Sequence, residues 1–295
     1  MIVVTAATGN IGKSLVENLL SQKVKVRALA RDPQKLKALQ DQGAETRVVD
    51  LTQQESVTNA FDGASAVFTL IPPKYDSPHF RDYYAQVGTV YAKALAQAGV
   101  KYVVNLSSVG AHLSAGTGPV TGLHEQEKRL NALPGVNIVH LRPGYFMENM
   151  FFSFGLIKSQ GINGSPVKPD AKISMIATKD IAGVAAKYLT ARNFTGQIVH
   201  ELLGPRDLTL TEATQIIGQA IGKPSLPYIQ FPYEEAHKAM VSMGLSADVA
   251  TLFNEMYKAF NDGTMVPTQA RSAMTTTPTP LEEFAKTFAA VYQKN

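Results

Sequence analysis

The chain has 295 residues, of which 45% are hydrophobic and 18% charged, with a formal net charge of +4. This balance is typical of a globular protein with an apolar core and excludes a disordered chain. The chain has no cysteine, which excludes disulfides, thiolate metal sites and cysteine nucleophiles. The basic residues form no run, so the sequence does not favour nucleic-acid binding.

No stretch of the sequence is long and apolar enough to span a bilayer, and Met1 is followed directly by an expected strand rather than by a signal peptide. We therefore expect a cytoplasmic protein with no membrane partner. The histidines are dispersed without the spacing of metal ligands, so we expect no metal. The sequence leaves a homodimer open.

The first half of the chain alternates short β-rich runs with helical stretches. Strands are expected at residues 2–4, 24–29, 45–49, 66–71, 102–106 and 138–141, and helices at 11–20, 33–40, 53–61, 80–98 and 123–133. This alternation predicts an α/β fold with a Rossmann-type, doubly wound parallel sheet and right-handed crossovers.

After residue 144 the pattern becomes mostly helical. Helices are expected at residues 177–188, 211–221, 234–243, 247–260 and 281–292, with one β-like run at 198–203. We therefore expect a Rossmann domain over residues 1–155 and a smaller, mostly helical substrate lobe over residues 156–295. The run at 198–203 is expected to rejoin the sheet of the first domain.

A glycine pattern lies between the first strand and the first helix and reads Ala6-x-x-Gly9-x-x-Gly12. Gly9 would let the backbone approach a pyrophosphate, and Gly12 would let the helix pack tightly on the sheet. The free N–H groups at the helix start would then face the phosphates. The alternative is an ordinary turn that uses glycine for geometry alone. Because the strand–turn–helix context is present, the pattern favours an NAD(P)-binding domain.

The second strand ends at Arg31, where NAD-binding domains place an acidic residue on the ribose hydroxyls. A guanidinium is suited to a 2′-phosphate, so this position predicts NADP as the cofactor, with NADPH preferred over NADH. The alternative for Arg31 is a solvated surface cation.

Several segments together resemble the NmrA-like branch of the atypical short-chain dehydrogenase/reductases. They are Thr5-Ala-Ala-Thr-Gly-Asn-Ile-Gly12, Arg27-Ala-Leu-Ala-Arg-Asp-Pro33, Leu70-Ile-Pro-Pro73, Asn105-Leu-Ser-Ser108 and Leu141-Arg-Pro-Gly-Tyr-Phe-Met-Glu-Asn149. The resemblance implies NADPH binding, and enzymes of this branch reduce quinones, azo dyes or triphenylmethane dyes. Other members sense NADP without turnover.

The resemblance also assigns site residues by their position in its motifs. The residues expected at the cofactor, from the phosphates through the adenine and the ribose to the nicotinamide, are Thr8, Gly9, Asn10, Ile11 and Gly12, then Arg31, Asp50 and Leu51, then Leu70, Ile71 and Pro72, and finally Ser107, Lys128, Pro143 and Tyr145. The expected catalytic residues are His124, Lys128 and Tyr145.

Two positions depart from the pattern of the family. Ala6 stands where glycine is usual, and alanine fits there only if its φ is negative. His124 and Lys128 stand where the wider superfamily has Tyr-x-x-x-Lys. Four residues apart on a helix, they would share a face and could both reach the cofactor. The alternative is that they belong to a polar, solvated helix surface.

Two functions follow from these observations. The first is an NADPH-dependent reductase that passes hydride directly to a quinone or a similar conjugated aromatic acceptor, with the cofactor supplying the chemistry. The second is a binding module that senses NADPH and changes its shape or its partner. Turnover of NADPH with a panel of quinones separates the two.

Overall fold

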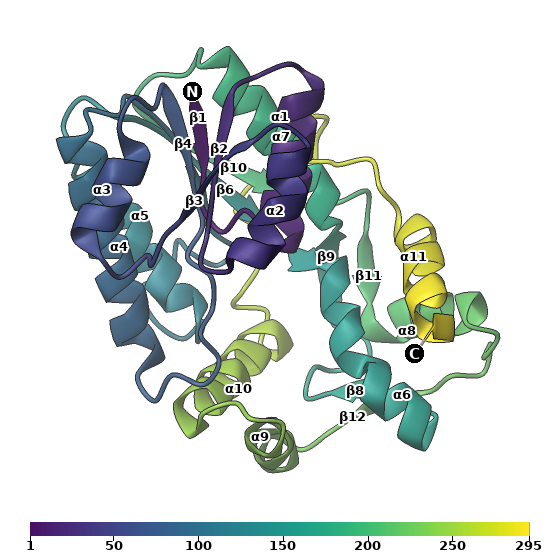
Figure 1. Cartoon of the computed structure of the whole chain (residues 1–295). Coiled ribbons are helices and arrows are strands. Elements are labelled where there is room, and N and C mark those ends of the chain that lie inside the picture. Colours follow the sequence, from purple (N-terminus) through teal and green to yellow (C-terminus); the bar gives the residue numbers. More distant parts are fainter. Residues whose placement is uncertain (295) are drawn as a thin grey trace.

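The computed structural model describes residues 1–294 and is organised around one parallel sheet (Figure 1). Its strands are β1 (Ile2–Val4), β2 (Val26–Ala30), β3 (Glu45–Val48), β4 (Ala66–Thr69), β5 (Tyr102–Leu106), β6 (Asn137–Pro143) and β10 (Gln197–Leu202). Within the described residues they lie in the order β10-β6-β5-β4-β1-β2-β3, and every neighbouring pair is parallel. The predicted doubly wound α/β fold is thereby confirmed, and β10 returns to the edge of the sheet beside β6.

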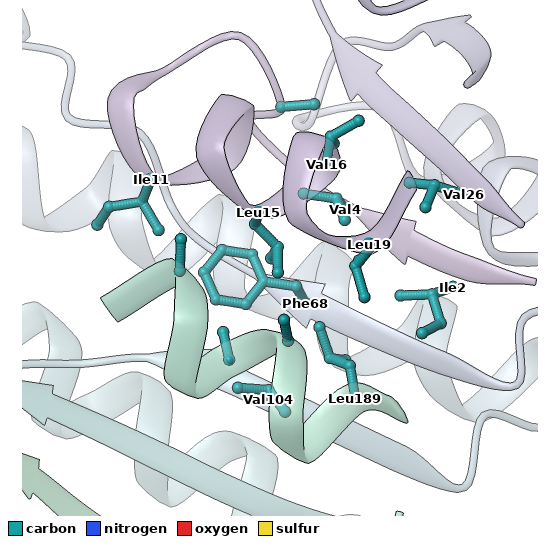
Figure 2. Packing of buried hydrophobic residues seen from close by; sticks show 14 of the residues in the cluster. Ile2, Val4, Ile11, Leu15, Val16, Leu19, Val26, Phe68, Val104 and Leu189 are labelled. Carbon is teal, nitrogen blue, oxygen red and sulfur yellow. The ribbon is translucent and has the colours of Figure 1, made fainter. Parts of the chain in front are cut away.

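Helices cover both faces of this sheet. One face carries α1 (Asn10–Ser21), α2 (Pro33–Asp41) and α7 (Thr178–Ala191), and the other carries α3 (Gln54–Phe61), α4 (Phe80–Gln97) and α5 (Val120–Asn131). The central strands β1 and β4 are buried on both sides, as a sheet covered on both faces requires. Figure 2 shows the first core, where Leu15 and Leu19 of α1 gather with Phe68 of β4 and Leu189 of α7.

Helix α7 belongs to this layer although it lies within residues 156–295, which were expected to form the substrate lobe. Its inner face combines Ile181 and Leu189 with three small residues, Ala182, Ala185 and Ala186, and all five are buried in the same core as α1. Small side chains allow two helices to approach closely. The chain therefore enters the lobe after β6, returns for α7 and β10, and enters the lobe again.

The lobe combines helices with short strands. Its helices are the 3₁₀ helix η1 (Met147–Ser153), α6 (Phe154–Gln160), α8 (Leu210–Ala220), α9 (Tyr233–Ser242), α10 (Ala247–Asn261) and α11 (Leu281–Lys294), and its strands are β7 (Tyr145–Phe146), β8 (Asn163–Ser165), β9 (Lys172–Ile176), β11 (Asp207–Thr209) and β12 (Tyr228–Gln230). Phe151, Phe154, Phe284 and Phe288 stack together in its core. The small sheet β11-β9-β7 was not predicted, because its strands are too short to show a period of their own.

Helix α10 is attached to the Rossmann domain by a small set of polar contacts. Ser246, its N-cap, donates from Oγ to the carbonyl of Ser77 (2.5 Å) and from its backbone N–H to the carbonyl of Tyr75 (2.9 Å). Asp248 in turn accepts from the backbone N–H of Phe80 (2.8 Å), at the start of α4. Gly118 approaches α10 so closely that a Cβ there would lie 2.0 Å from the carbonyl oxygen of Leu252.

Among residues 1–294, no helix is both long and apolar enough to cross a membrane.

Candidate functional site

A cleft of about 630 Å³ runs along the carboxyl ends of the central strands. The turns that follow β1, β2, β4, β5 and β6 form one wall of the cleft, and β7, β9 and α10 form the other. In open α/β sheets, the crevice outside the carboxyl ends of the strands is where ligands bind. The two walls come from the Rossmann domain and the lobe, so a ligand in this cleft touches both.

The turn between β1 and α1 is held in one backbone conformation. Ala6 has a φ of +49°, in the left-handed region that favours glycine. Gly12 is packed against this turn, since a Cβ at Gly12 would lie 2.3 Å from the carbonyl oxygen of Ala6. Gly9, in contrast, has a φ of −82°, and a Cβ there would meet only the Ala6 carbonyl oxygen, at 3.5 Å. Gly12 is therefore required by the fold, whereas Gly9 leaves open space in the cleft.

This turn is suited to hold the phosphates of a dinucleotide. Gly9 is the N-cap of α1 and has no side chain to accept the first N–H groups of the helix. Those N–H groups, with the positive end of the helix dipole, therefore remain available for an anion. Thr8, Asn10 and Ile11 line the cleft beside them.

Two cations lie where the second strand ends. Arg31 and Lys35 line the cleft and are exposed, and neither forms an ion pair with any described residue. Asp32, which lies between them in the sequence, forms no ion pair with either cation. Its carboxylate instead accepts from the backbone N–H of Gln34 (2.9 Å) and caps α2. Lys35 was not singled out from the sequence, because it lies in the first turn of α2 whereas Arg31 precedes the helix.

Asp50 lies near this basic end but outside the lining of the cleft. Its carboxylate accepts from the backbone N–H (2.9 Å) and the hydroxyl (2.7 Å) of Thr52. These hydrogen bonds, with the nearby charge of Arg31, hold the pKa of Asp50 below its usual value. Its neighbours Val49 and Leu51 line the cleft and give this end of it an apolar surface.

Two hydroxyl groups form hydrogen bonds to the backbone of Leu70, in the turn after β4. The Thr5 hydroxyl accepts from the backbone N–H of Leu70 (2.9 Å), and the Tyr91 hydroxyl donates to the Leu70 carbonyl (2.9 Å). Both groups are buried. Leu70, Ile71 and Pro72, at and after this anchored turn, line the cleft.

Ser107 is held by a buried ion pair that the sequence did not reveal. Its hydroxyl donates to Oε1 of Glu127 (2.5 Å), and Arg142 donates to both carboxylate oxygens of Glu127 (2.9 and 2.5 Å). The side chains of Arg142 and Glu127 are only 9% and 7% exposed. Ser107 thus lies at the floor of the cleft with its hydroxyl directed toward Glu127.

Helix α5 presents a different face to the cleft from the one expected. Val120 and Leu123 line the cleft, and Glu127 continues the same face one turn later. His124 does not line the cleft, and its Nδ1 lies 2.9 Å from the carbonyl oxygen of Ala111. Lys128 is exposed to solvent and also lies outside the lining of the cleft. The inward positions are one residue earlier than expected, since Glu127 is paired with the buried Arg142.

The far end of the cleft is an apolar wall rich in aromatic side chains. Tyr145, Phe146 and Phe152 reach it from the segment after β6, whereas Phe151 packs in the core of the lobe. Helix α10 supplies the facing residues, and the sequence analysis did not identify them. They are Phe253, Met256, Tyr257 and Phe260, followed by Met265, Val266 and Pro267.

Most of the expected site residues meet in this one cleft. Those that line it are Thr8, Gly9, Asn10, Ile11, Arg31, Leu51, Leu70, Ile71, Pro72, Ser107, Pro143 and Tyr145. Four expected residues do not line it, namely Gly12, Asp50, His124 and Lys128. Among residues 1–294, no three His, Asp or Glu side chains are placed to hold a metal ion.

Comparison with known proteins places the chain in a family. A model described as the NmrA-like family matches residues 1–285. The chain belongs to the NmrA-like family. This NmrA-like protein is 29% identical over 257 residues to an NAD(P)H azoreductase from Xenophilus azovorans, covering 87% of this chain and 86% of the relative. It is 27% identical over 259 residues to quinone oxidoreductase 2 of Escherichia coli, covering 85% of each.

Solved structures share the fold of this NmrA-like chain almost end to end. A triphenylmethane reductase from Citrobacter, in complex with NADP(H), matches with a TM-score of 0.79 and 25% identity, covering 98% of this chain and 100% of the other. An NADPH-dependent quinone oxidoreductase from Escherichia coli, in complex with NADPH, matches with a TM-score of 0.81 and 24% identity, covering 98% and 99%.

Proposed function

We propose that this protein is an NADPH-dependent reductase that passes hydride directly to a quinone or a similar conjugated aromatic acceptor. One observation carries the proposal. A single cleft joins a phosphate-binding turn and two unpaired cations at one end to an apolar aromatic wall at the other. The named relatives, an NAD(P)H azoreductase and a quinone oxidoreductase, support the same chemistry.

Different parts of the cofactor are bound by different residues of the chain. The N–H groups at the start of α1 bind the pyrophosphate, and Arg31 and Lys35 bind the 2′-phosphate of the adenosine ribose. Leu70, Ile71 and Pro72 border the nicotinamide ribose on the turn that Thr5 and Tyr91 hold. Ser107, Pro143 and Tyr145 then bound the space for the nicotinamide ring.

Bound NADPH would supply a hydride, and the resulting hydroquinone anion takes up one proton from water. The aromatic wall holds a flat acceptor against the cofactor, so proximity and orientation lower the barrier. Reduction of an aliphatic ketone produces a strongly basic alkoxide and needs a positioned acid. Among the described residues, no Asp, Glu or His side chain lines the cleft, and burial raises the pKa of Tyr145 and Tyr257, which do line it, so that these hydroxyls are weak acids. A quinone suits this cleft better, because the charge of the hydroquinone anion is delocalised.

The test is NADPH oxidation by the purified protein without added flavin, with 1,4-naphthoquinone as one acceptor and cyclohexanone as the other. We expect kcat/KM for the quinone to exceed that for the ketone by about 100-fold or more, the scale of a missing general acid. Efficient ketone reduction would contradict the proposal. Tight NADPH binding without turnover of any quinone or azo dye would favour the NADPH sensor instead.

A further inference from the structure

Three tyrosines from three different elements line the acceptor end of the cleft, and Tyr257 lies near both of the others. Tyr75 comes from the turn after β4, Tyr145 from β7 and Tyr257 from α10, and all three line the cleft. Within residues 1–294 none of the three hydroxyls has a hydrogen-bond partner in the protein. In contrast, the hydroxyl of Tyr228, also in the lobe, donates to the carbonyl of Val167 (2.8 Å) and lies outside the cleft lining.

The surroundings keep these phenols protonated. Burial raises the pKa of Tyr257 to about 12, and the nearby Tyr75 hydroxyl adds to the shift. Burial likewise raises the pKa of Tyr145, with Tyr257 as a further cause, and the pKa of Tyr75. At neutral pH all three are therefore hydrogen-bond donors, and they are close enough for an ionised form of one to disfavour that of the next.

The charged groups of the cleft indicate what these donors bind. Among the described lining residues, the cations are Arg31 and Lys35 at the nucleotide end and the exposed Lys172 on β9, and there is no acidic residue. A cationic acceptor would find no counter-charge here. A neutral acceptor that carries oxygen atoms would satisfy hydroxyl groups that otherwise remain unpaired beside an apolar surface.

We propose that Tyr257, together with Tyr145 and Tyr75, binds the carbonyl oxygens of the acceptor by hydrogen bonds, so that the preferred acceptors are neutral conjugated carbonyl compounds. This inference rests on the proposed reductase function and names the substrate class within it. Tyr257 is the member to test because it lies near both Tyr75 and Tyr145. Tyr145 and Tyr257 come from the lobe and Tyr75 from the Rossmann domain, so both walls of the cleft contribute to the choice of the acceptor.

The test is Tyr257→Phe, which removes one hydroxyl and keeps the ring. Binding of 1,4-naphthoquinone to the protein saturated with NADP⁺ is measured by calorimetry, and KM for the same quinone is measured in steady state. We expect both constants to rise about three- to tenfold, the scale of one neutral hydrogen bond. The Kd for NADPH should stay unchanged, because Tyr257 lies at the acceptor end of the cleft. Tyr228→Phe is the matched control.

Each outcome separates this inference from the proposed function. If wild-type protein turns over no acceptor, the proposed function fails, and calorimetry with the quinone still decides the role of Tyr257. Unchanged quinone binding in Tyr257→Phe would overturn the inference. An equal loss in Tyr228→Phe, or an equal loss of NADPH affinity in Tyr257→Phe, would also overturn it, because the effect would then be structural.

Discussion

Arg142 holds Glu127 through two parallel hydrogen bonds, from Nε to Oε1 at 2.9 Å and from Nη2 to Oε2 at 2.5 Å. Both side chains are buried beneath the cleft, where a lone charge is strongly disfavoured. We expect Glu127→Gln to lower the free energy of unfolding by about 3 kcal/mol or more, because Arg142 would keep its charge without a partner. Denaturant unfolding of both proteins measures this difference.

The control is the exposed pair between Lys37 and Asp41, which also has a short distance of 2.9 Å. Asp41→Asn should change the free energy of unfolding by less than about 0.5 kcal/mol, since surface pairs contribute little. A loss in Glu127→Gln as small as that in the control would show that Arg142 finds another partner or reaches solvent.

The left-handed backbone of Ala6 makes a second prediction. A residue with a Cβ in this conformation costs roughly 1–2 kcal/mol, whereas glycine adopts it freely but is more flexible in the unfolded chain. We expect Ala6→Gly to raise the free energy of unfolding by about 0.5–1 kcal/mol. Ala38→Gly, at an exposed position inside α2, should instead lower it by about 1 kcal/mol. Destabilisation by both would mean that the turn at Ala6 carries no strain.

The two glycines of the phosphate turn should respond differently to the same change. Gly9→Ala has room for its Cβ, so the protein should stay folded but lose NADPH affinity by about tenfold or more as the methyl group occupies the phosphate site. Gly12→Ala places a Cβ against the backbone of Ala6 and Ala7 and should destabilise the protein. Thermal unfolding and calorimetry separate the two effects. A Gly9→Ala protein that binds NADPH normally would move the phosphate site elsewhere.

Arg31 is expected to decide the choice between NADPH and NADH. Arg31→Gln removes a charge-assisted contact of about 1.5–3 kcal/mol to the 2′-phosphate, a loss of about 10- to 150-fold in NADPH affinity, and should leave NADH nearly unaffected. Lys35→Gln should act in the same direction, less strongly. Arg47→Gln is the control, because Arg47 is exposed, pairs with Glu45 (3.0 Å) and lies outside the cleft lining. An unchanged preference in Arg31→Gln would exclude Arg31 as the residue that reads the phosphate.

His124 and Lys128 provide a fifth prediction. Since neither side chain lines the cleft, His124→Ala and Lys128→Ala should each change the Kd for NADPH by less than about twofold, a shift smaller than one hydrogen bond contributes. The measurement is calorimetry, with quinone turnover followed in parallel. A tenfold loss in Lys128→Ala would restore the role that lysine has in the Tyr-x-x-x-Lys pattern of the superfamily.

The nucleotide end of the site could be read from the sequence because its signals are local. The strand, turn and helix around Gly9 and the arginine at the end of β2 each lie within a few residues of one another. Their roles follow from backbone geometry that a short motif determines. The alternation of strands and helices likewise predicted the parallel sheet, since each element carries its own period.

The acceptor end depends on contacts between distant segments. Tyr257 is an ordinary residue in an amphipathic helix until α10 docks on the turn after β4 through Ser246 and Asp248. The polar sequence of α5 does not indicate which face of the helix is directed toward the cleft. Glu127 lies on the buried face because it pairs with Arg142, which belongs to a distant segment. The position of α7 could not be predicted for the same reason. Its small residues pack against α1, but nothing in their sequence indicates which helix they contact.

The docking of α10 also bears on how such a protein can change during evolution. The residues proposed to bind the nucleotide lie in the first half of the chain, whereas the facing wall of the cleft comes from residues 253–267. The two stretches meet through hydrogen bonds at Ser246 and Asp248. Apolar packing adds to these contacts, because Val249 is buried in the core of the Rossmann domain. Substitutions along α10 can therefore alter which molecules fit without disturbing the hydride source. Proteins with this fold can therefore evolve to accept new substrates through substitutions in one helix while they keep the same coenzyme.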